Sequence, residues 1–160
     1  MNKAIFLDRD GVINKVRKES IKSWSEFEFL PGILEFLSKI AELDCYIFIV
    51  TNQSLVGRGV IEEEVLQDIH KHMLNVIEEN GGRIDAIYEC IHKAEDNCVC
   101  RKPKPGMILW ARRQYGLDLS KSVMIGDSES DKLTAENAGC KFISIKEGID
   151  LWKILKEKIS

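Results

Sequence analysis

Residues 3–14 read KAIFLDRDGVIN, a short apolar run followed by two carboxylates and a glycine. A short apolar run bounded by polar residues is typical of a buried strand in a parallel sheet. Such sheets bind ligands at the carboxyl ends of their strands. We therefore expect a strand over residues 3–7 and functional side chains at Asp8 and Asp10, with Gly11 allowing a sharp turn beyond them.

The same arrangement recurs along the chain, because four further apolar runs are followed by polar residues. These runs predict strands over residues 45–50, 86–90, 122–125 and 141–145. Segments of helical period predict helices over residues 32–42, 62–79, 106–115, 129–138 and 149–157. The alternation of strands and helices predicts an α/β fold with a parallel sheet of about five strands.

The composition is that of a folded protein with a core of its own. The 160 residues are 44% hydrophobic and 31% charged, with a net charge of −3 and a pI near 5.7. This balance gives no general attraction to nucleic acid or to an anionic membrane. No apolar run approaches the roughly 20 residues that span a bilayer, and no linker or repeat divides the chain. We expect a single domain over residues 1–160 that is a monomer, with neither nucleic-acid nor membrane partners.

The cysteines point to a metal site. Five cysteines without a visible secretion signal indicate the reducing cytoplasm, where thiols beside a histidine are metal ligands sooner than disulfides. The pattern C-x-H-x5-C-x-C supplies a complete tetrahedral shell for structural zinc from Cys90, His92, Cys98 and Cys100. Unrelated thiols or a redox pair are the alternative. The two remaining cysteines, Cys45 and Cys140, stand beside apolar stretches and are expected in the core.

The helix expected over residues 62–79 carries an apolar stripe and two histidines. The stripe is formed at helical spacing by Val65, Ile69, Met73 and Val76. His70 and His72 are two positions apart, so they lie on different faces and are unsuited to sharing a metal. We expect both histidines at the surface.

Polar residues also follow two other expected strands and the cysteine pattern. After residues 45–50 comes Thr51-Asn52-Gln53, whose hydroxyl and amide donors suit phosphate oxygens but equally suit capping a loop. Arg101-Lys102-Pro103 follows the cysteine pattern, and Gly126-Asp127, with Asp131, follows residues 122–125. A phosphate monoester attacked by a carboxylate needs cations to offset charge repulsion. Asp8 and Asp127 offer oxygen ligands for Mg²⁺, and Lys102 offers a fixed positive charge. With Asp8 as nucleophile, Asp10 can protonate the departing alkoxide and later take a proton from water.

Four motifs, in order, carry a family resemblance. DRDGVIN, VTNQS, RKP and IGDSESD resemble the motifs of the haloacid dehalogenase (HAD) superfamily of phosphatases, over residues 3–145. The resemblance implies a Rossmann-like, doubly wound sheet. It also implies that Asp8 is the nucleophile, that Asp10 is the general acid and base, and that Thr51 and Lys102 hold the phosphoryl oxygens.

The resemblance further implies a Mg²⁺ site formed by Asp8, the backbone carbonyl of Asp10, and Asp127. Asp131 either supports Lys102 or a metal-bound water, or is simply an acid in the first turn of a helix. The intervals between the motifs leave no room for an inserted cap domain. The site is therefore expected to be open or closed only by short loops.

The zinc pattern beside RKP narrows the resemblance to heptose bisphosphate phosphatases and histidinol-phosphate phosphatases. The short x5 spacer is more similar to the histidinol group, whereas NQS, GRG and FEFLPG, with more positions, are more similar to the heptose group. The resemblance favours removal of the C7 phosphate of D-glycero-D-manno-heptose 1,7-bisphosphate, with histidinol phosphate or another sugar phosphate as the alternative. Substrate contacts are expected from Asn52, Gln53, Ser54, Arg58, Arg101 and Ser128.

Some features depart from the heptose pattern or leave two interpretations. Ser20, Leu55 and Ser128 stand where the heptose enzymes commonly have tyrosine, glycine and often lysine. The basic residues between Asn14 and Trp24 either form a solvated loop or recognise a second phosphate.

Two other classes of protein share some of these features. A phosphoacceptor receiver uses similar residue types, but it would place its aspartate after a middle strand, and we expect that strand to end in Thr51. A zinc-stabilised nucleic-acid module would need a basic surface interleaved with aromatic residues, which the sequence lacks. We therefore expect the partner to be a small phosphorylated metabolite.

Overall fold

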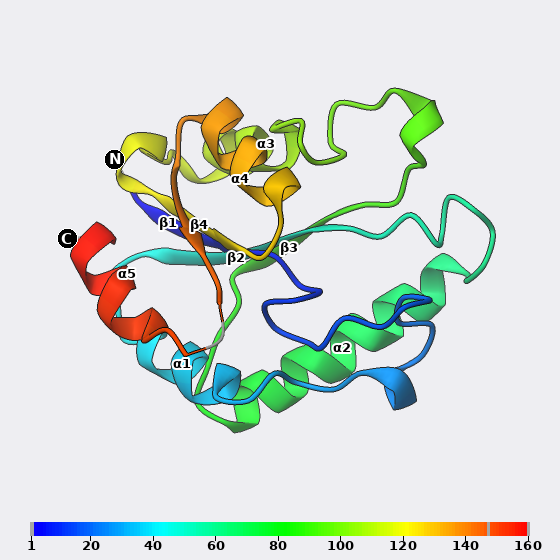
Figure 1. The fold of residues 1–160 in the computed structure, drawn as a ribbon, viewed down its shortest axis with the longest axis horizontal. Helices are drawn as coiled ribbons and strands as arrows, with labels where there is room; N and C mark the ends of the chain where they lie inside the picture. The colour runs from blue at the N-terminus through cyan, green and yellow to red at the C-terminus, as the bar shows by residue number, and fades with distance from the viewer. Residues whose placement is uncertain (1, 147, 160) are drawn as a thin grey trace.

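A five-stranded parallel sheet forms the centre of the molecule (Figure 1), in a computed structural model that describes residues 2–146 and 148–159. The strands are β1 (Ala4–Leu7), β2 (Tyr46–Asn52), β3 (Ala86–Cys90), β4 (Val123–Gly126) and β5 (Lys141–Ser144). They lie in the order β3-β2-β1-β4-β5, and every neighbouring pair is parallel. The chain thus builds the sheet from its centre to one edge and then to the other, which confirms the doubly wound fold.

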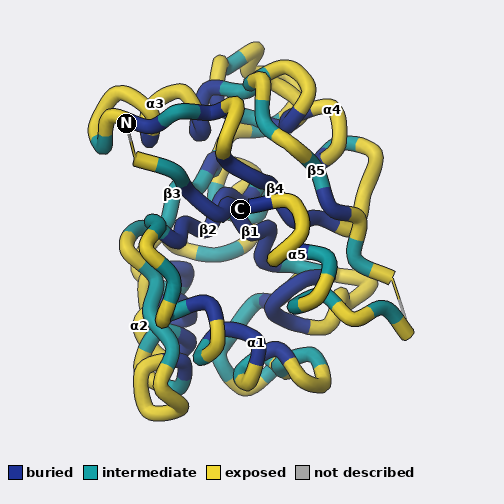
Figure 2. The backbone as a smooth tube through the Cα atoms, turned by 90° about the vertical axis from the view of Figure 1, so that its left-hand side faces the viewer, coloured by how far each residue is buried: buried dark blue, intermediate teal, exposed yellow. Residues whose placement is uncertain are grey.

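Helices cover both faces of the sheet (Figure 2). They are α1 (Ile33–Ile40), α2 (Glu63–Glu79), α3 (Gly106–Tyr115), α4 (Glu129–Ala138) and α5 (Leu151–Ile159). Because successive strand residues face opposite sides, Ile5 and Leu7 pack with α1, α2 and α5, whereas Ala4 and Phe6 pack with α3 and α4. Two apolar cores therefore hold the sheet between its helices and fix the ends of the strands.

The predicted bounds are close to the observed ones. β3, α3 and α4 have the predicted bounds, α5 is shifted by two residues, and β2 continues through Thr51 and Asn52. The sequence did not predict three single turns of 3₁₀ helix at Trp24–Glu26, Ala94–Asp96 and Leu119–Lys121. A single turn is too short to show an apolar period.

Helix α2 corrects one expectation about the histidines. His70 is only 2% exposed, so its predicted surface position is wrong, whereas His72 is exposed as expected. His70 tolerates burial because Arg9 and Glu89 provide polar partners. The buried side of the helix is formed by Leu66, Ile69, His70, Met73 and Ile77. Val65 and Val76, expected in the stripe, are half-buried.

The position of β1 corrects a second expectation. β1 is the central strand, and Asp8 follows it directly, so the prediction that the middle strand ends in Thr51 is wrong. Strand order in a doubly wound sheet differs from chain order, because the chain starts at the centre of the sheet. The place of Thr51 therefore does not distinguish this fold from a receiver.

The remaining expectations concern cysteines and the membrane. Cys45 and Cys140 are half-buried at the margins of the two cores and not fully inside them. None of the helices in the described part of the chain has the length and apolar character required to span a membrane.

Candidate active site

Three carboxylates meet at the carboxyl ends of β1 and β4. Asp8 follows β1, Asp127 follows β4, and Asp131 lies in the first turn of α4. Each offers an oxygen that lies within 4.8 Å of the others. Because β1 and β4 are adjacent parallel strands, residues far apart in sequence are brought together at one edge of the sheet, as predicted from the motifs.

The turn after β1 needs a glycine for two reasons. Gly11 has a φ of +90°, which residues with a side chain rarely adopt. A Cβ atom at this position would also collide with Oδ2 of Asp127. The glycine in DRDG therefore allows the backbone to approach the carboxylate cluster.

Lys102 lies between two of the carboxylates. Its Nζ donates to Asp8 Oδ1 at 2.8 Å, to Asp131 Oδ1 at 2.7 Å and to the carbonyl oxygen of Val50 at 3.1 Å. The lysine side chain is only 4% exposed. Asp131 thus contacts Lys102, as one of its interpretations expected, and it also lies in the first turn of α4.

Asn52 holds the backbone of Lys102 in place. Its Oδ1 accepts from the Lys102 amide at 3.0 Å, and its Nδ2 donates to the Lys102 carbonyl at 3.3 Å. Asn52 was expected to contact substrate, but in this structure both ends of its amide bind the loop that carries the lysine.

The Asp10 carboxylate is held apart from the other three. Its Oδ1 accepts from Arg9 Nη2 and from Asn14 Nδ2, both at 2.9 Å, and its Oδ2 accepts from Gln53 Nε2 at 2.8 Å. The same Gln53 nitrogen lies 2.9 Å from the hydroxyl of Thr51. Gln53, expected as a substrate contact, is buried and links the two side chains.

Burial and charge together perturb these carboxyl groups. Burial raises the pKa of Asp8 to about 7, against the opposing effect of Lys102. Burial and the nearby charge of Asp131 also raise the pKa of Asp127. At Asp131, burial acts to raise the pKa, but Lys102 together with hydrogen bonds from Ser128 and the Asp127 amide lowers it. Asp8 and Asp131 thus share one ammonium group, which Asp127 does not contact, and a divalent cation at the oxygens of Asp8 and Asp127 would offset the remaining repulsion.

The pKa of Asp10 is lowered, in contrast to those of Asp8 and Asp127. Burial favours its neutral form, but the Arg9 charge and hydrogen bonds from Asn14, Arg9 and Gln53 outweigh burial and lower the pKa. The carboxylate is therefore stabilised by donors on both of its oxygens.

A second cluster lies in the segment before Lys102. The ligand atoms of Cys90, His92, Cys98 and Cys100 are within 4.8 Å of one another. Two thiolate sulfurs bound to one tetrahedral zinc ion lie about 3.8 Å apart. The sulfurs of Cys90 and Cys98 are 3.6 Å apart, which is close to this distance. His92 Nδ1 is 3.7 Å and 3.3 Å from the sulfurs of Cys90 and Cys100, whereas these two sulfurs lie closer, at 2.7 Å.

The chemistry of this cluster also fits zinc. Although burial opposes it, hydrogen bonds from the Arg101 amide and the neighbouring thiols lower the pKa of Cys98 to about 6. This shift favours the metal-binding thiolate form at Cys98, whereas burial raises the pKa of Cys90 and of Cys100. The fit to zinc therefore rests on the types and spacing of the four ligands. The donor set and most of its spacing could therefore hold a zinc ion without an open coordination position.

Four other residues were expected to contact substrate. Ser54 is half-buried, and Arg58 is exposed in the loop after β2. Arg101 is half-buried and donates to the carbonyl of His92 at 3.3 Å. Ser128 caps α4, since its hydroxyl accepts from the Asp131 amide at 3.2 Å.

The basic segment after Asn14 is largely paired with acids. Lys15 pairs with Glu28, and both Arg17 and Lys22 pair with Glu26. These pairs favour the interpretation of a solvated loop over that of a phosphate-binding one.

The sequence did not indicate which residues donate hydrogen bonds to the Asp10 carboxylate. Arg9 and Asn14 are fully buried and donate to its carboxylate. Both lie inside DRDGVIN, so their closeness to Asp10 was visible, but residue type alone did not show where they point. His70 and Glu89 extend this group, and nothing in their spacing indicated the contact.

A groove of about 930 Å³ opens beside the carboxylate cluster. Gly11 and Asp127 lie at its wall, with residues of α1 and of the segment between β5 and α5. The described residues place no separate cap domain over the carboxyl ends of the strands.

Comparison with known proteins agrees with this geometry. A HAD-hydrolase-like family model matches residues 99–158. A D-glycero-beta-D-manno-heptose-1,7-bisphosphate 7-phosphatase of Helicobacter pylori is 41% identical over 141 residues, which cover 88% of this chain and 81% of that protein. A D-glycero-alpha-D-manno-heptose-1,7-bisphosphate 7-phosphatase of Mycobacterium bovis is 40% identical over 135 residues, which cover 83% and 71%.

A solved structure is similar over the same extent. The crystal structure of the D,D-heptose 1,7-bisphosphate phosphatase from B. bronchiseptica, complexed with magnesium and phosphate, matches with a TM-score of 0.85 and 39% identity, covering 88% of this chain and 78% of that one. The fold, the motifs and these similarities agree, and the chain belongs to the HAD-like family of phosphatases that includes the heptose 1,7-bisphosphate 7-phosphatases.

Proposed function

We propose that this chain is a Mg²⁺-dependent phosphatase that removes the C7 phosphate of D-glycero-D-manno-heptose 1,7-bisphosphate through an aspartyl-phosphate intermediate. The observation that carries the chemistry is the contact of Lys102 with both Asp8 and Asp131, beside Asp127, at the end of the central strand. The names of the relatives support the substrate.

Asp8 attacks the phosphorus atom, and the phosphoryl group passes from the sugar oxygen to the carboxylate. Asp10 must carry a proton when the substrate reacts, against the net lowering of its pKa. It gives this proton to the departing alkoxide and regains one from the water that hydrolyses the aspartyl phosphate. Lys102 and the hydroxyl of Thr51 stabilise the charge on the phosphoryl oxygens. Hydrogen bonds from Asn14 and Gln53 fix the direction of the Asp10 carboxylate.

Side-chain oxygens of Asp8 and Asp127, together with the backbone carbonyl of Asp10, would hold Mg²⁺. When bound, this ion offsets the repulsion between an anionic nucleophile and an anionic substrate. The cluster suits a hard cation because its donors are carboxylate oxygens, and because the ammonium of Lys102 alone leaves negative charge in excess.

The four residues Cys90, His92, Cys98 and Cys100 would hold a structural Zn²⁺. A closed shell leaves no position for substrate, so this site acts on the fold of the loop. The cluster ends two residues before Lys102, and Gly57 of the loop after β2 donates to the carbonyl of Ile91 at 3.0 Å. An ordered cluster therefore supports both loops that flank the catalytic lysine.

The open site suits a polar sugar phosphate. Arg101 stands next to Lys102, and Arg58 is exposed on the neighbouring loop, so both can reach toward a second, non-reacting phosphate. Ser54 and Ser128 add hydroxyl groups in the same region. Histidinol phosphate is the second candidate, favoured by the short spacer of the cysteine cluster.

A phosphate-release screen tests this proposal. The purified protein with Mg²⁺ is offered the α and β anomers of the heptose bisphosphate, histidinol phosphate and common sugar monophosphates. We expect the highest kcat/KM for one anomer of the bisphosphate, with loss of the C7 phosphate and retention of the 1-phosphate. A higher kcat/KM for histidinol phosphate would replace the substrate assignment, and no phosphate release from any ester would overturn the function.

A further inference from the structure

Arg9 is a fully buried cation next to Asp10. Its Nε and Nη2 lie 3.3 Å and 2.9 Å from Oδ1 of Asp10, and its Nη1 lies 3.1 Å from Nε2 of His70. The guanidinium carbon is 5.9 Å from the centre of the Phe27 ring. The side chain is 0% exposed, so its orientation is set entirely by these protein partners.

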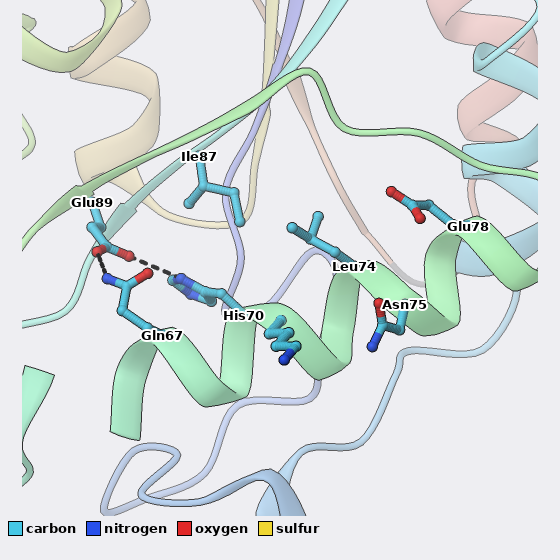
Figure 3. A pocket seen from close by; sticks show the side chains of 8 residues that line it. Gln67, His70, Leu74, Asn75, Glu78, Ile87 and Glu89 are labelled. Atoms are coloured by element: carbon cyan, nitrogen blue, oxygen red, sulfur yellow. Dashed lines mark hydrogen bonds and ion pairs between the residues drawn. The ribbon is translucent and has the colours of Figure 1, made fainter. Parts of the chain in front are cut away.

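The contact with Arg9 fixes the tautomer of His70. A guanidinium can only donate hydrogen bonds, so Nε2 of the imidazole must accept and carries no proton. The ring proton is then on Nδ1, which lies 2.8 Å from Oε2 of Glu89, although the N–H does not point squarely at that oxygen. Glu89 in turn accepts from Gln67 (Figure 3).

We propose that Glu89, His70 and Arg9 form a buried line of contacts that positions the Asp10 carboxylate for proton transfer. This inference rests on the proposed function, in which Asp10 is the general acid and base. The three residues do not touch the reacting atoms and are positioning residues.

The geometry gives each residue a separate task. Arg9 holds Oδ1 of Asp10, while Gln53 holds Oδ2 from the opposite side. Nε2 of His70 accepts from Nη1 of Arg9, the guanidinium nitrogen that does not bind Asp10. If the guanidinium turned, this buried N–H would lose its partner. Glu89 lies 2.8 Å from the other ring nitrogen of His70 and is the acidic partner on that side of the ring. A shift of a general acid by even 1 Å lowers the rate of proton transfer.

The outer end of this line is open to solvent. Glu89 is 18% exposed, and a pocket of about 330 Å³ lies between α2 and β3, with Gln67, His70 and Glu89 in its wall (Figure 3). Substitutions at this end can therefore be made without removing a residue of the two apolar cores. Lys71 lines the same pocket, is exposed, and offers a matched control.

The test compares two substitutions of similar size, His70→Met and His70→Gln. Glutamine can accept from Arg9 and donate to Glu89, whereas methionine can do neither. Each variant is assayed on a sugar phosphate, whose leaving group needs a proton, and on p-nitrophenyl phosphate, whose leaving group does not. The quantity compared is kcat/KM, because it reports only the steps through departure of the alcohol.

We expect His70→Met to lose about 10-fold in kcat/KM on the sugar phosphate and less than about 3-fold on the aryl ester. His70→Gln should restore the sugar phosphate activity to within about 3-fold of the unmodified protein. Lys71→Met should change neither activity. If His70→Met fails to fold, Glu89→Met, whose side chain can no longer accept from His70, replaces it, with the same preference for loss on the sugar phosphate.

Three results would overturn the proposal: an equal loss on both esters, no loss on either in a folded His70→Met variant, or no recovery with His70→Gln. A separate variant tests the proposed function itself. An Asp10→Asn variant that loses equally on both esters would remove the general-acid role itself, whatever the His70 variants do.

Discussion

The carboxylate cluster and the cysteine cluster are the two metal-binding candidates in the described residues, and they are built in opposite ways. Asp8, Asp127 and Asp131 are brought together by adjacent strands from both ends of the chain. The four residues of the cysteine cluster lie within residues 90–100. The first cluster needs the whole sheet, whereas the second needs only a local loop.

The two clusters also differ in what they leave open. The cysteine cluster offers four ligands, which is a closed shell for zinc. The carboxylate cluster includes a lysine, lies beside a groove and contains a carboxylate whose pKa burial raises to about 7. An incomplete and strongly charged shell is suited to chemistry on a bound anion, and a complete one is suited to holding a fold.

The substitution Asp8→Asn is the strongest test that the carboxylate cluster performs the chemistry. An amide neither attacks phosphorus nor balances cation charge, so phosphate release should fall by at least about 1,000-fold. The protein should still fold, because Lys102 keeps Asp131 as a partner. Steady-state kinetics with a thermal melt check both points. Asp44→Asn, an exposed control, should keep full activity, and normal turnover by folded Asp8→Asn would remove Asp8 as nucleophile.

A smaller effect is expected from Gly11→Ala. The added Cβ would collide with Oδ2 of Asp127, so the carboxylate must move away from the cation site. Activity should fall by about 10- to 100-fold, with a higher Mg²⁺ concentration needed for half-maximal rate. A Mg²⁺ titration of phosphate release measures this.

Gly116→Ala is the control that distinguishes the collision of a new Cβ with Asp127 from the backbone strain of an alanine at positive φ. Gly116 also has a positive φ, +63°, but, apart from its own chain neighbours and local backbone, no atom of the described residues lies within 4 Å of the position that a Cβ would take. This control should lower the melting temperature and leave the Mg²⁺ requirement unchanged. An unchanged Mg²⁺ requirement in Gly11→Ala as well would mean that Asp127 does not bind the cation.

The smallest effect is expected at the cysteine cluster. We expect about one tightly bound zinc per chain, which Cys98→Ser should release, with an activity loss of about 10-fold through disorder around Lys102. Metal analysis after gel filtration and limited proteolysis of residues 91–105 measure both consequences. Cys140→Ser, outside the cluster, should keep its zinc. A zinc-free protein that is folded and fully active would reject the structural role.

The same contrast explains which parts of the site could be predicted from sequence. The cysteine cluster is local, so spacing alone predicted its four members. Asp8 and Asp127 could be predicted because each follows an apolar run, and parallel strands bring such residues to one edge. His70 could not be placed, because its burial depends on Arg9 and Glu89, which only the packing of α2 against the sheet brings near.

Residue type also failed to predict direction. Asn52 and Gln53 were expected at the substrate because amides suit phosphate oxygens. The structure instead directs them to Lys102 and Asp10. An amide donor is equally suited to a ligand and to a neighbouring catalytic side chain, and the sequence contains no information that separates the two uses.

Covalent catalysis by Asp8 is the central claim, and stereochemistry at phosphorus tests it most directly. A phosphorothioate ester of the preferred substrate, made chiral with oxygen isotopes, is hydrolysed in isotopically labelled water. Each in-line displacement inverts phosphorus, so transfer to Asp8 followed by attack of water predicts overall retention. Overall inversion would show that water attacks the substrate directly, and it would contradict the aspartyl-phosphate intermediate.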